Sequence, residues 1–598
     1  MPADRYTVTP HPVKTLLAWV EAKEIAIPEI QRPFVWSSTQ VRDLLDSLYK
    51  GFPVGYLIAW RNPNIRLKDG TTSAGKKILI DGQQRVTALM AAFLGREVVT
   101  KDYKRTRIKI AFNPKDERFE VSNPAIEKDA AWIHDVAELF KPEVKLFDFV
   151  KAFCTKNPDA SQEEVFQKID FVRGMANNLV GLIELNDDLD IQTVTEIFIR
   201  INSAGTELSQ ADFAMSKIAT NESYGGQDLR KAIDYFCHLA VEPQYYALIK
   251  DADSAFTKTD YWKQMTWLKD EQDDIYDPKY TDMLRVAFTT EFKRGKLEDL
   301  VALLGGRNFE TKVHEEAIAE ESFHRLSRAV MDFMNKTDFQ RFVMIIRSAG
   351  FVDASMLTSQ NALNFAYILY LTLRKDKKSP AIIETLVRRW FVLATLTGRY
   401  SGTPESTFDY DIRQLHLQGC EAFIKSTEAA ELSEAFWTAA LPMSMNTSVA
   451  SSPYFRVFKA AQILAEDKGF LSKAHTVAIL QEGHSDVHHL FPRDLLKKNG
   501  KSRGEYNQIA NYAVTQTEIN IAIGNKEPKN YMGKVLEQCE GGDLKYGNIT
   551  SLRTLKSNLR DHCIPEGFEF MTVADYEEFL KARRVLMAQK IRTYYESL

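Results

Sequence analysis

An abrupt change of hydrophobic period at residues 76–94, KKILIDGQQRVTALMAAFL, leaves few choices for the local fold. Ile78 to Ile80 form a short apolar run typical of a strand, and Asp81-Gly82 is typical of a tight turn. Apolar residues then recur with a helical period at Val86, Leu89, Met90 and Phe93. The segment therefore predicts a strand, a tight turn and a helix in direct succession.

This arrangement is suited to holding an anion. A helix that starts at a glycine turn directs free backbone N–H groups and a positive dipole end outward, and Gly82 allows close approach. Arg85 in the first turn could add a planar fork to a phosphate. The GK[ST] ending of a Walker A loop is missing. The alternative is an ordinary capped helix whose Asp, Gln and Arg side chains satisfy one another.

Two further segments of the N-terminal third carry polar pairs beside predicted loops. In IPEIQRPFVWSSTQVRDLL, two prolines exclude a helix from Ile27 to Trp36, so Gln31-Arg32 lies on an extended stretch. Ser37 and Gln40 then form a capping box at the start of a helix.

In VTEIFIRINSAGTELSQADF, Arg200 and Asn202 flank a turn-rich loop, and Ser209 with Asp212 starts the next helix. The loop could close on a ligand, or it could be a purely structural turn.

The motifs PEIQRPFVW, IDGQQRVTAL and FIRINSAGTELS, in this order, resemble the ParB/sulfiredoxin-like nucleotide-binding domain of the GmrSD-type, modification-dependent (type IV) restriction enzymes. The resemblance covers roughly residues 13–217 and implies that this region binds and hydrolyses a nucleoside triphosphate. By position it assigns nucleotide-site roles to Gln31 and Arg32, to Asp81, Gly82, Gln83, Gln84 and Arg85, and to Arg200 and Asn202.

A chain of 598 residues is too long for a single core, so two to four domains are expected. Residues 225–473 show long helical periods and few strand signals, which favours a helical domain in the middle of the chain.

Charge and cysteine content narrow the class of protein only slightly. A net charge of −4 counts mildly against a nucleic-acid binder, although a local cleft can still be basic. The five cysteines are scattered, without a CxxC pair, which indicates reduced thiols and neither a disulfide framework nor a cysteine zinc site. No apolar run reaches the roughly 18 residues of a membrane span, and the start lacks a secretory signal pattern, so we expect a cytoplasmic protein.

The stretch HSDVHHLFPRDLLKKNG, residues 484–500, places two histidines side by side. Val487 to Phe491 predicts a strand that Pro492 ends. Since neighbouring side chains of a strand face opposite sides, His488 and His489 serve one site only if the strand bends or ends there.

A second strand and a helix are expected after a polar loop. Asn511 to Thr515 reads as the strand, and Thr515 with Glu518 reads as the cap of a helix that carries Asn520.

This order of elements makes chemical sense as a one-metal nuclease. Phosphodiester hydrolysis needs a base, for which an imidazole with a pKa near ~6.5 is suited, and a cation that stabilises developing charge. An Asn oxygen and one imidazole are a credible partial shell for the cation, and an Asn at the start of the second strand can hold the loop and orient the base. The alternative is two exposed histidines near a strand end.

These residues are similar to an HNH (ββα-metal, His-Me finger) nuclease domain, from about His475 to Tyr531 with a helical tail. The resemblance implies His489 as general base, His488 and Asn520 as metal ligands, and Asn511 as the central asparagine of the motif. The family more often has Asp at the position of His488, and a neutral ligand there weakens Mg²⁺ or favours Mn²⁺, Ni²⁺ or Zn²⁺. Lys526 and Lys529 could meet the DNA backbone or face solvent; His484 and Asp486 are spare ligand candidates.

The sequence as a whole predicts a multidomain α+β protein. Its expected parts are a ParB-like α+β domain at residues 1–222, a helical connecting domain at 223–470, and an HNH domain with C-terminal helices at 471–598. The resemblances imply a phage-defence endonuclease, active as a homodimer, that cuts double-stranded DNA with hydroxymethylated or glucosylated cytosines, using a divalent metal and a nucleoside triphosphate. Two alternatives remain: an NTP-hydrolysing sensor whose HNH module binds DNA without cutting, and an RNA-cleaving abortive-infection effector.

Overall fold

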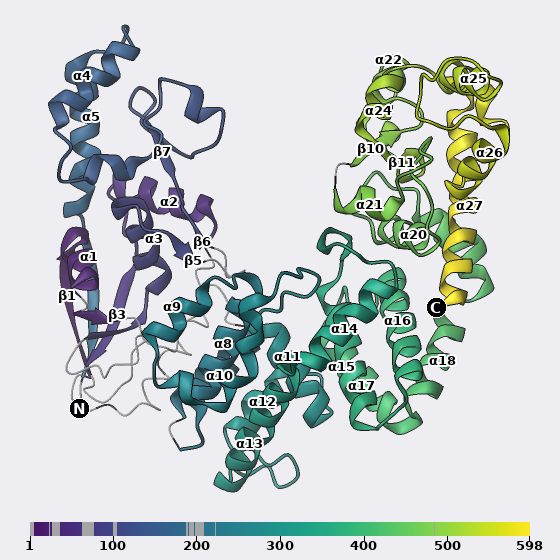
Figure 1. The fold of residues 1–598 in the computed structure, drawn as a ribbon. Coiled ribbons are helices and arrows are strands. Elements are labelled where there is room, and N and C mark those ends of the chain that lie inside the picture. The colour runs from purple at the N-terminus through teal and green to yellow at the C-terminus, as the bar shows by residue number, and fades with distance from the viewer. Residues whose placement is uncertain are drawn as a thin grey trace. The chain divides into compact units, whose positions relative to one another are not determined.

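A computed structural model of the chain, drawn as a ribbon in Figure 1, describes residues 5–22, 24–26, 36–61, 77–99, 105–186, 189, 197, 209–221, 223–483 and 485–598. The chain divides into two compact units. The first comprises Met1–Glu271, Lys279–Thr281 and Leu300–His324, and the second comprises Gln272–Pro278, Asp282–Asp299 and Arg325–Leu598. The predicted multidomain α+β class is confirmed. The boundary between the units runs inside residues 223–470, where the sequence predicts one helical domain.

A five-stranded mixed sheet organises the first unit. Its order is β1 (Tyr6–Pro12), β9 (Leu179–Leu185), β3 (Tyr56–Arg61), β4 (Lys77–Asp81) and β2 (Ile25–Ala26). β1 runs antiparallel to β9, β9 parallel to β3, β3 antiparallel to β4, and β4 parallel to β2. Because β4 is hydrogen-bonded on both sides, the turn that follows Asp81 leaves the sheet from an anchored strand.

Three helices bury their apolar faces in one core with the strands: α1 (Val13–Glu21), α2 (Ser38–Tyr49) and α3 (Gln83–Leu94). The capping box predicted for α2 is present, since the Ser37 hydroxyl accepts from the Gln40 N–H and the Gln40 side chain accepts from the Ser37 N–H. α3 starts directly after the turn that ends β4, as the change of hydrophobic period predicts.

The rest of the first unit combines short strands with helices. It contains β5 (Val98–Val99), β6 (Arg105–Thr106), β7 (Ile110–Asn113), β8 (Arg118–Val121), α4 (Leu146–Lys156), α5 (Gln162–Gly174), α7 (Gln210–Thr220), α8 (Gly226–Val241), α9 (Tyr245–Ala252), α10 (Asp260–Met265) and α12, whose bounds are Leu297–Leu304. The predicted capping box of Ser209 and Asp212 opens α7.

Helices also build most of the second unit. They are α11 (Tyr280–Phe292), the second half of α13 (Glu316–Phe333), α14 (Lys336–Ser348), α15 (Gln360–Lys375), α16 (Pro380–Thr397), α17 (Pro404–Gln418), α18 (Cys420–Glu431), α19 (Leu441–Ser444) and α20 (Pro453–Leu464). The first half of α13, to His324, belongs to the first unit. All residues of α15 from Ala362 to Leu373 are buried. A helix buried all round belongs at the centre of a core.

The C-terminal part of this unit contains the predicted pair of strands and helix, which we call the ββα motif: β10 (Ser485–His489), β11 (Tyr512–Gln516) and α24 (Thr517–Ile523). Around it lie α21 (Val477–Glu482), α22 (Arg493–Lys498), α23 (Arg503–Tyr506), α25 (Pro528–Cys539), α26 (Leu552–Asp561) and α27 (Tyr576–Ser597).

Two local expectations for this motif are wrong. β10 ends at His489 and does not continue to Phe491. Thr515 does not cap α24, whose N-cap is Gln516 and makes no side-chain cap bond. The reason is a backbone contact: the Phe470 N–H donates to the Val514 carbonyl at 2.8 Å, and the Thr515 hydroxyl donates to the Phe470 carbonyl at 2.7 Å.

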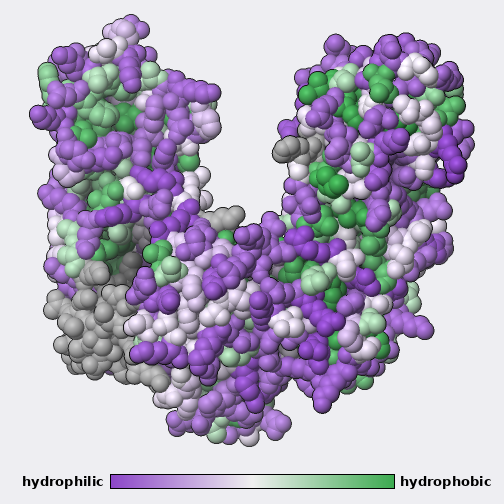
Figure 2. Space-filling view, viewed as in Figure 1, coloured by the Kyte–Doolittle hydropathy of each residue, from purple (hydrophilic) through white to green (hydrophobic). Residues whose placement is uncertain are grey.

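The cysteines, the hydropathy of the helices and the polarity of the surface are the features that composition bears on. All five cysteines are free thiols, four of them buried. Within the described ranges, no helix is long and apolar enough to cross a membrane. Figure 2 shows hydrophilic side chains over most of the described surface that faces the viewer, with smaller apolar patches between them.

One buried lysine makes the stability of the second unit depend on pH. Lys459 on α20 is 4% exposed, and its Nζ donates to the Gln481 side-chain oxygen at 2.6 Å. Burial lowers the pKa of Lys459 from the usual 10.5 to about 7, with Arg456 lowering it further and Asp353 opposing both. Its stabilising contribution is therefore complete above pH 10.5 and is lost as the pH falls to about 7.

We expect Lys459→Met to remove this pH dependence. Between about pH 7 and pH 10.5 Lys459 is protonated in the unfolded chain and neutral in the folded chain. The wild-type free energy of unfolding therefore rises with pH in this range, by up to about 1.4 kcal/mol per pH unit. Urea unfolding at several pH values should therefore show the variant's advantage over wild type shrinking as the pH rises. A constant difference would contradict the assignment, and the exposed Lys473→Met is the control.

Candidate active site

The ββα motif carries its two histidines on opposite sides of an antiparallel hairpin. His488 lies opposite Ala513, and His489 lies opposite Tyr512. Successive side chains of a strand alternate between its faces. β10 ends at His489, which is one of the conditions under which both rings can serve one site.

The structure brings together the two side chains predicted to hold a metal. The His488 side chain is buried, and its Nδ1 lies 2.7 Å from Oδ1 of Asn520 on α24. Adjacent ligand atoms of an octahedral Mg²⁺ lie about 3.0 Å apart when the bonds are about 2.1 Å long. In this structure the two atoms are joined by a hydrogen bond, which Nδ1 donates to the amide oxygen. A divalent cation held by both would take the place of that hydrogen, with the two atoms about 0.3 Å further apart.

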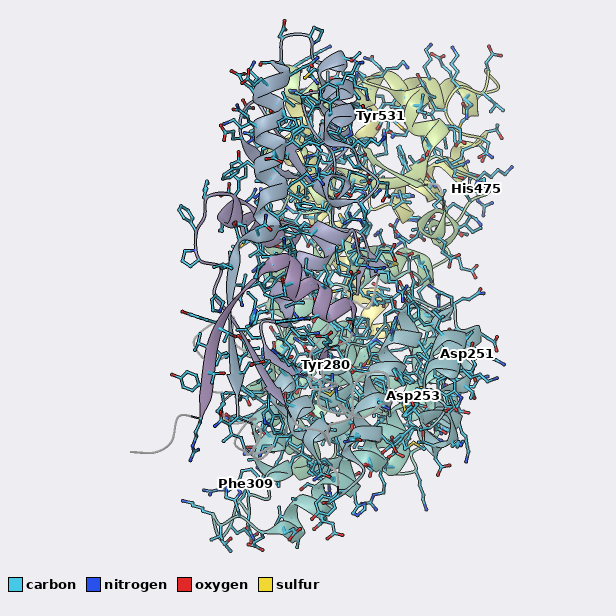
Figure 3. The ribbon with its side chains drawn as sticks, turned by 90° about the vertical axis from the view of Figure 1, so that its left-hand side faces the viewer. Asp251, Asp253, Tyr280, Phe309, His475 and Tyr531 are labelled. Carbon is cyan, nitrogen blue, oxygen red and sulfur yellow. The ribbon has the colours of Figure 1, made fainter. Side chains whose placement is uncertain are left out.

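Aromatic rings hold His488 in place. Its ring stacks on Phe470 with centroids 5.6 Å apart, and it meets the edge of Tyr531 at 6.3 Å. Tyr531, labelled in Figure 3, is itself fixed because its hydroxyl donates to the Leu490 carbonyl at 2.9 Å. The imidazole thus keeps one orientation toward Asn520.

The donor set is neutral as far as the structure describes it. Among the described side chains, no three His, Cys, Asp or Glu groups lie close enough to hold a metal ion. His484 and the side chain of Asp486, the spare candidates, lie outside the described residues. One imidazole and one amide oxygen would leave most of the shell to water and substrate oxygens.

His489 has the properties of a neutral base. Its Nε2 donates to Oδ1 of Asn507 at 3.0 Å, and its ring meets Tyr512 edge-on at 5.0 Å. Burial lowers the pKa of His489 below the usual 6.5, so the ring is neutral at pH 7. The sequence predicts Asn511 as the residue that orients this ring, but the partner of Nε2 is Asn507.

Asn511 instead ties the loop between the strands together. Its fully buried amide accepts from the Phe491 N–H at 2.8 Å and donates to the Phe491 and Tyr506 carbonyls at 3.0 and 3.2 Å. The end of the first strand and the end of the loop are therefore held by one side chain, which is the loop-holding role expected for this position.

Arg583 on α27 holds the backbone on either side of Asn511 by hydrogen bonds. It is fully buried and donates to the carbonyls of Ala510 and Tyr512, both at 2.8 Å, and of His562 at 3.0 and 3.2 Å. Burial lowers its pKa to about 10, so the guanidinium is still charged at pH 7. Arg583 thus supplies hydrogen-bond donors to three buried carbonyl groups.

Sequence reasoning missed Asn507 and Arg583. Asn507 looks like any loop asparagine, and Arg583 sits beside Arg584 in a helix rich in charge. Both lysines predicted to meet DNA are exposed, and Lys526 also donates to the Ala522 carbonyl at 2.9 Å near the end of α24. A DNA contact stays a prediction for both.

The nucleotide motif of the first unit has part of the expected geometry. Gly82, with φ 93°, precedes the first residue of α3, so the N–H groups of the first helical turn follow the glycine turn directly. Asp81, Gly82, Gln83, Gln84 and Arg85 are all half-buried around this turn. Gln31, Arg32, Arg200 and Asn202 lie outside the described residues.

The guanidinium of Arg85 packs against the backbone of two glycines, Gly55 and Gly82. Its Nη1 donates to the Tyr56 carbonyl at 2.6 Å, and burial lowers its pKa while Asp81 raises it. A Cβ on Gly55 would lie 2.9 Å from Nη2 of Arg85, and one on Gly82 would lie 3.3 Å from Nη1. The guanidinium therefore depends on two positions without side chains and is held at the start of the helix.

Together these features define a multidomain α+β chain with a helix that starts at a glycine turn in one unit and a ββα motif with two adjacent histidines in the other. Residues 14–219 match the protein family described as GmrSD restriction endonuclease, N-terminal domain. This match supports the GmrSD-type resemblance and, with it, a restriction-type nuclease. An uncharacterized protein of Methanocaldococcus jannaschii is 23% identical over 632 residues, which cover 97% of this chain and 98% of that protein.

We expect Arg583→Leu to loosen the ββα motif. Its loss leaves three buried carbonyls without their donor, which should cost at least about 3 kcal/mol. Hydrogen exchange at residues 510–512 should accelerate, and the denaturation midpoint should fall. Arg584→Leu is the matched control, since this neighbour is only half-buried and donates to Asn446 at 3.3 Å. Equal effects of the two variants would contradict the bracing role.

Proposed function

We propose that the chain is a type IV restriction endonuclease of phage defence that hydrolyses DNA with a divalent metal. The observation that carries this proposal is the arrangement of the ββα motif. Nδ1 of His488 and Oδ1 of Asn520 lie 2.7 Å apart, close enough for one cation to replace the hydrogen between them, and His489, the next residue of β10, is neutral at pH 7. The match of residues 14–219 to a restriction endonuclease domain supports DNA as the substrate.

In the proposed mechanism His489 is the general base. Its Nε2 donates to Asn507, so the lone pair on Nδ1 takes a proton from water as the water oxygen attacks phosphorus. A new P–O bond forms while the bond to the leaving ester oxygen breaks. A metal held by His488 and Asn520 would stabilise the charge on the phosphorane and on the leaving oxygen. Asn511 holds the loop from which the base is oriented.

The metal preference follows from the ligands. An imidazole at the position of His488 is neutral, so less charge attracts a hard Mg²⁺ than with a carboxylate ligand. Mn²⁺, Ni²⁺ and Zn²⁺ accept nitrogen ligands more readily. We therefore propose Mg²⁺ or one of these softer ions as cofactor.

We also propose that the first unit binds and hydrolyses a nucleoside triphosphate that regulates cutting. The start of α3 and the guanidinium of Arg85 provide N–H donors suited to a phosphate. The GmrSD-type resemblance adds DNA with hydroxymethylated or glucosylated cytosines as substrate and a homodimer as the active form. Cleavage of both strands by a single-metal nuclease requires two sites or two events.

Two other functions are compatible with the same sites. In one, the nucleotide domain is an NTP-hydrolysing sensor and the ββα motif binds DNA without cutting it. In the other, the protein cuts RNA as an abortive-infection effector. A neutral imidazole one residue after His488, at the end of the same strand, favours catalysis over simple binding.

We expect His489→Ala to lower the cleavage rate by about 10²-fold or more, because the proton acceptor is lost. The assay compares modified with unmodified phage DNA, with Mg²⁺ or Mn²⁺, with and without a nucleoside triphosphate. His475→Ala is the control, since His475 is an exposed histidine of the same region, labelled in Figure 3. Full cleavage by His489→Ala would exclude the proposed base, and RNA is the next substrate if neither DNA is cut.

We expect Arg85→Ala to reduce nucleotide hydrolysis by at least about tenfold, because charge-assisted hydrogen bonds contribute about 1.5–3 kcal/mol. Phosphate release and binding of a labelled nucleotide measure the effect. Arg96→Ala is the control, because Arg96 follows α3 and pairs with Glu21 on the surface at 2.8 Å. Unchanged hydrolysis in Arg85→Ala would mean that its guanidinium only stabilises the turn.

A further inference from the structure

We infer that Asn507 positions His489, by fixing which ring nitrogen carries the hydrogen. Asn507 lies outside the residues that the family resemblance assigns. The inference rests on the proposed function, in which His489 is the base. Asn507 is a positioning residue, since it contacts the ring and not the reacting atoms.

The hydrogen bond itself selects the form of the ring. An amide oxygen accepts and does not donate, so Oδ1 of Asn507, 3.0 Å away, requires a hydrogen on Nε2 of His489. A neutral imidazole carries a single N–H, which leaves Nδ1 with its lone pair. Tyr512 meets the same ring edge-on at 5.0 Å and limits its rotation. Both the tautomer and the direction of the base are thereby set.

Asn507 can do this because its own backbone is held at several points. Its N–H donates to the Arg503 carbonyl at 3.2 Å at the end of α23. The carbonyl of the preceding residue, Tyr506, accepts from Asn511 at 3.2 Å. One residue earlier, the carbonyl of Glu505 accepts from the Tyr576 hydroxyl at 2.8 Å. A side chain on a fixed loop can hold a partner at a fixed angle.

Asn511 holds the loop, and Asn507 on that loop binds the ring of His489. Asn511 joins the strand end at Phe491 to the carbonyl of Tyr506, and Asn507 follows Tyr506 directly. His489 lies two residues before Phe491 on the same segment. The side chain of Asn511 thus sets the distance between base and positioning residue, although it does not accept the hydrogen of the ring.

The kinetic test compares three variants on modified DNA with metal present. Asn507→Leu keeps the approximate size and removes the acceptor, and we expect kcat to fall about 10–100-fold with KM nearly unchanged. Asn507→Asp keeps an acceptor oxygen at the same place and should restore kcat to near wild type. Asn499→Leu is the matched control at the end of α22, where the exposed amide donates only to the Leu495 carbonyl at 2.9 Å.

A spectroscopic readout separates this inference from the proposed function. In protein labelled with ¹⁵N histidine, His489, assigned by comparison with His489→Ala, should show a protonated Nε2 and a bare Nδ1. Asn507→Leu should lose this pattern, and Asn507→Asp should keep it. A protonated Nδ1 in wild type, or an unchanged pattern and unchanged kcat in Asn507→Leu, would overturn the inference. A wild type with the expected pattern that cuts no nucleic acid would overturn the proposed function while upholding the positioning of the ring.

Discussion

The C-terminal site depends on the buried amide of Asn511. A buried amide without partners is costly, and this one is satisfied only while the strand end at Phe491 and the loop end at Tyr506 stay together. His489 belongs to the first of these segments and Asn507 to the second. The hydrogen bonds of the Asn511 amide therefore bring His489 and Asn507 into contact, although Asn511 itself binds neither nitrogen of the His489 ring.

Much of the local structure could be predicted because its causes lie within a few residues. The change of period at Gly82 fixes β4 and α3, and the capping boxes at Ser37 and Ser209 depend on partners three residues away. The order of strand, loop, strand and helix at residues 485–523 follows from the same local signals. The closeness of His488 and Asn520 follows from the family resemblance, because residue spacing alone also allows two exposed histidines.

What could not be predicted depends on distant partners. Thr515 has the sequence of a cap, but its hydroxyl is used by the carbonyl of Phe470, 45 residues earlier. The partner of His489 is one of several loop asparagines, and only the fold shows which one reaches the ring. A single sequence contains no signal for such contacts, because each residue type is ordinary at its own position.

The long sequence separation between Arg583 and its hydrogen-bond partners also sets the order in which contacts form during synthesis. Its partners Ala510 and Tyr512 lie 73 and 71 residues earlier in the chain. At translation rates of about 5–20 residues per second, these carbonyls emerge about 4–15 seconds before their donor. Contacts of such long separation form only after the cost of closing the loop has been met. The loop that orients His489 is therefore among the last parts of a nascent chain to become rigid, and a partly made chain holds no assembled site.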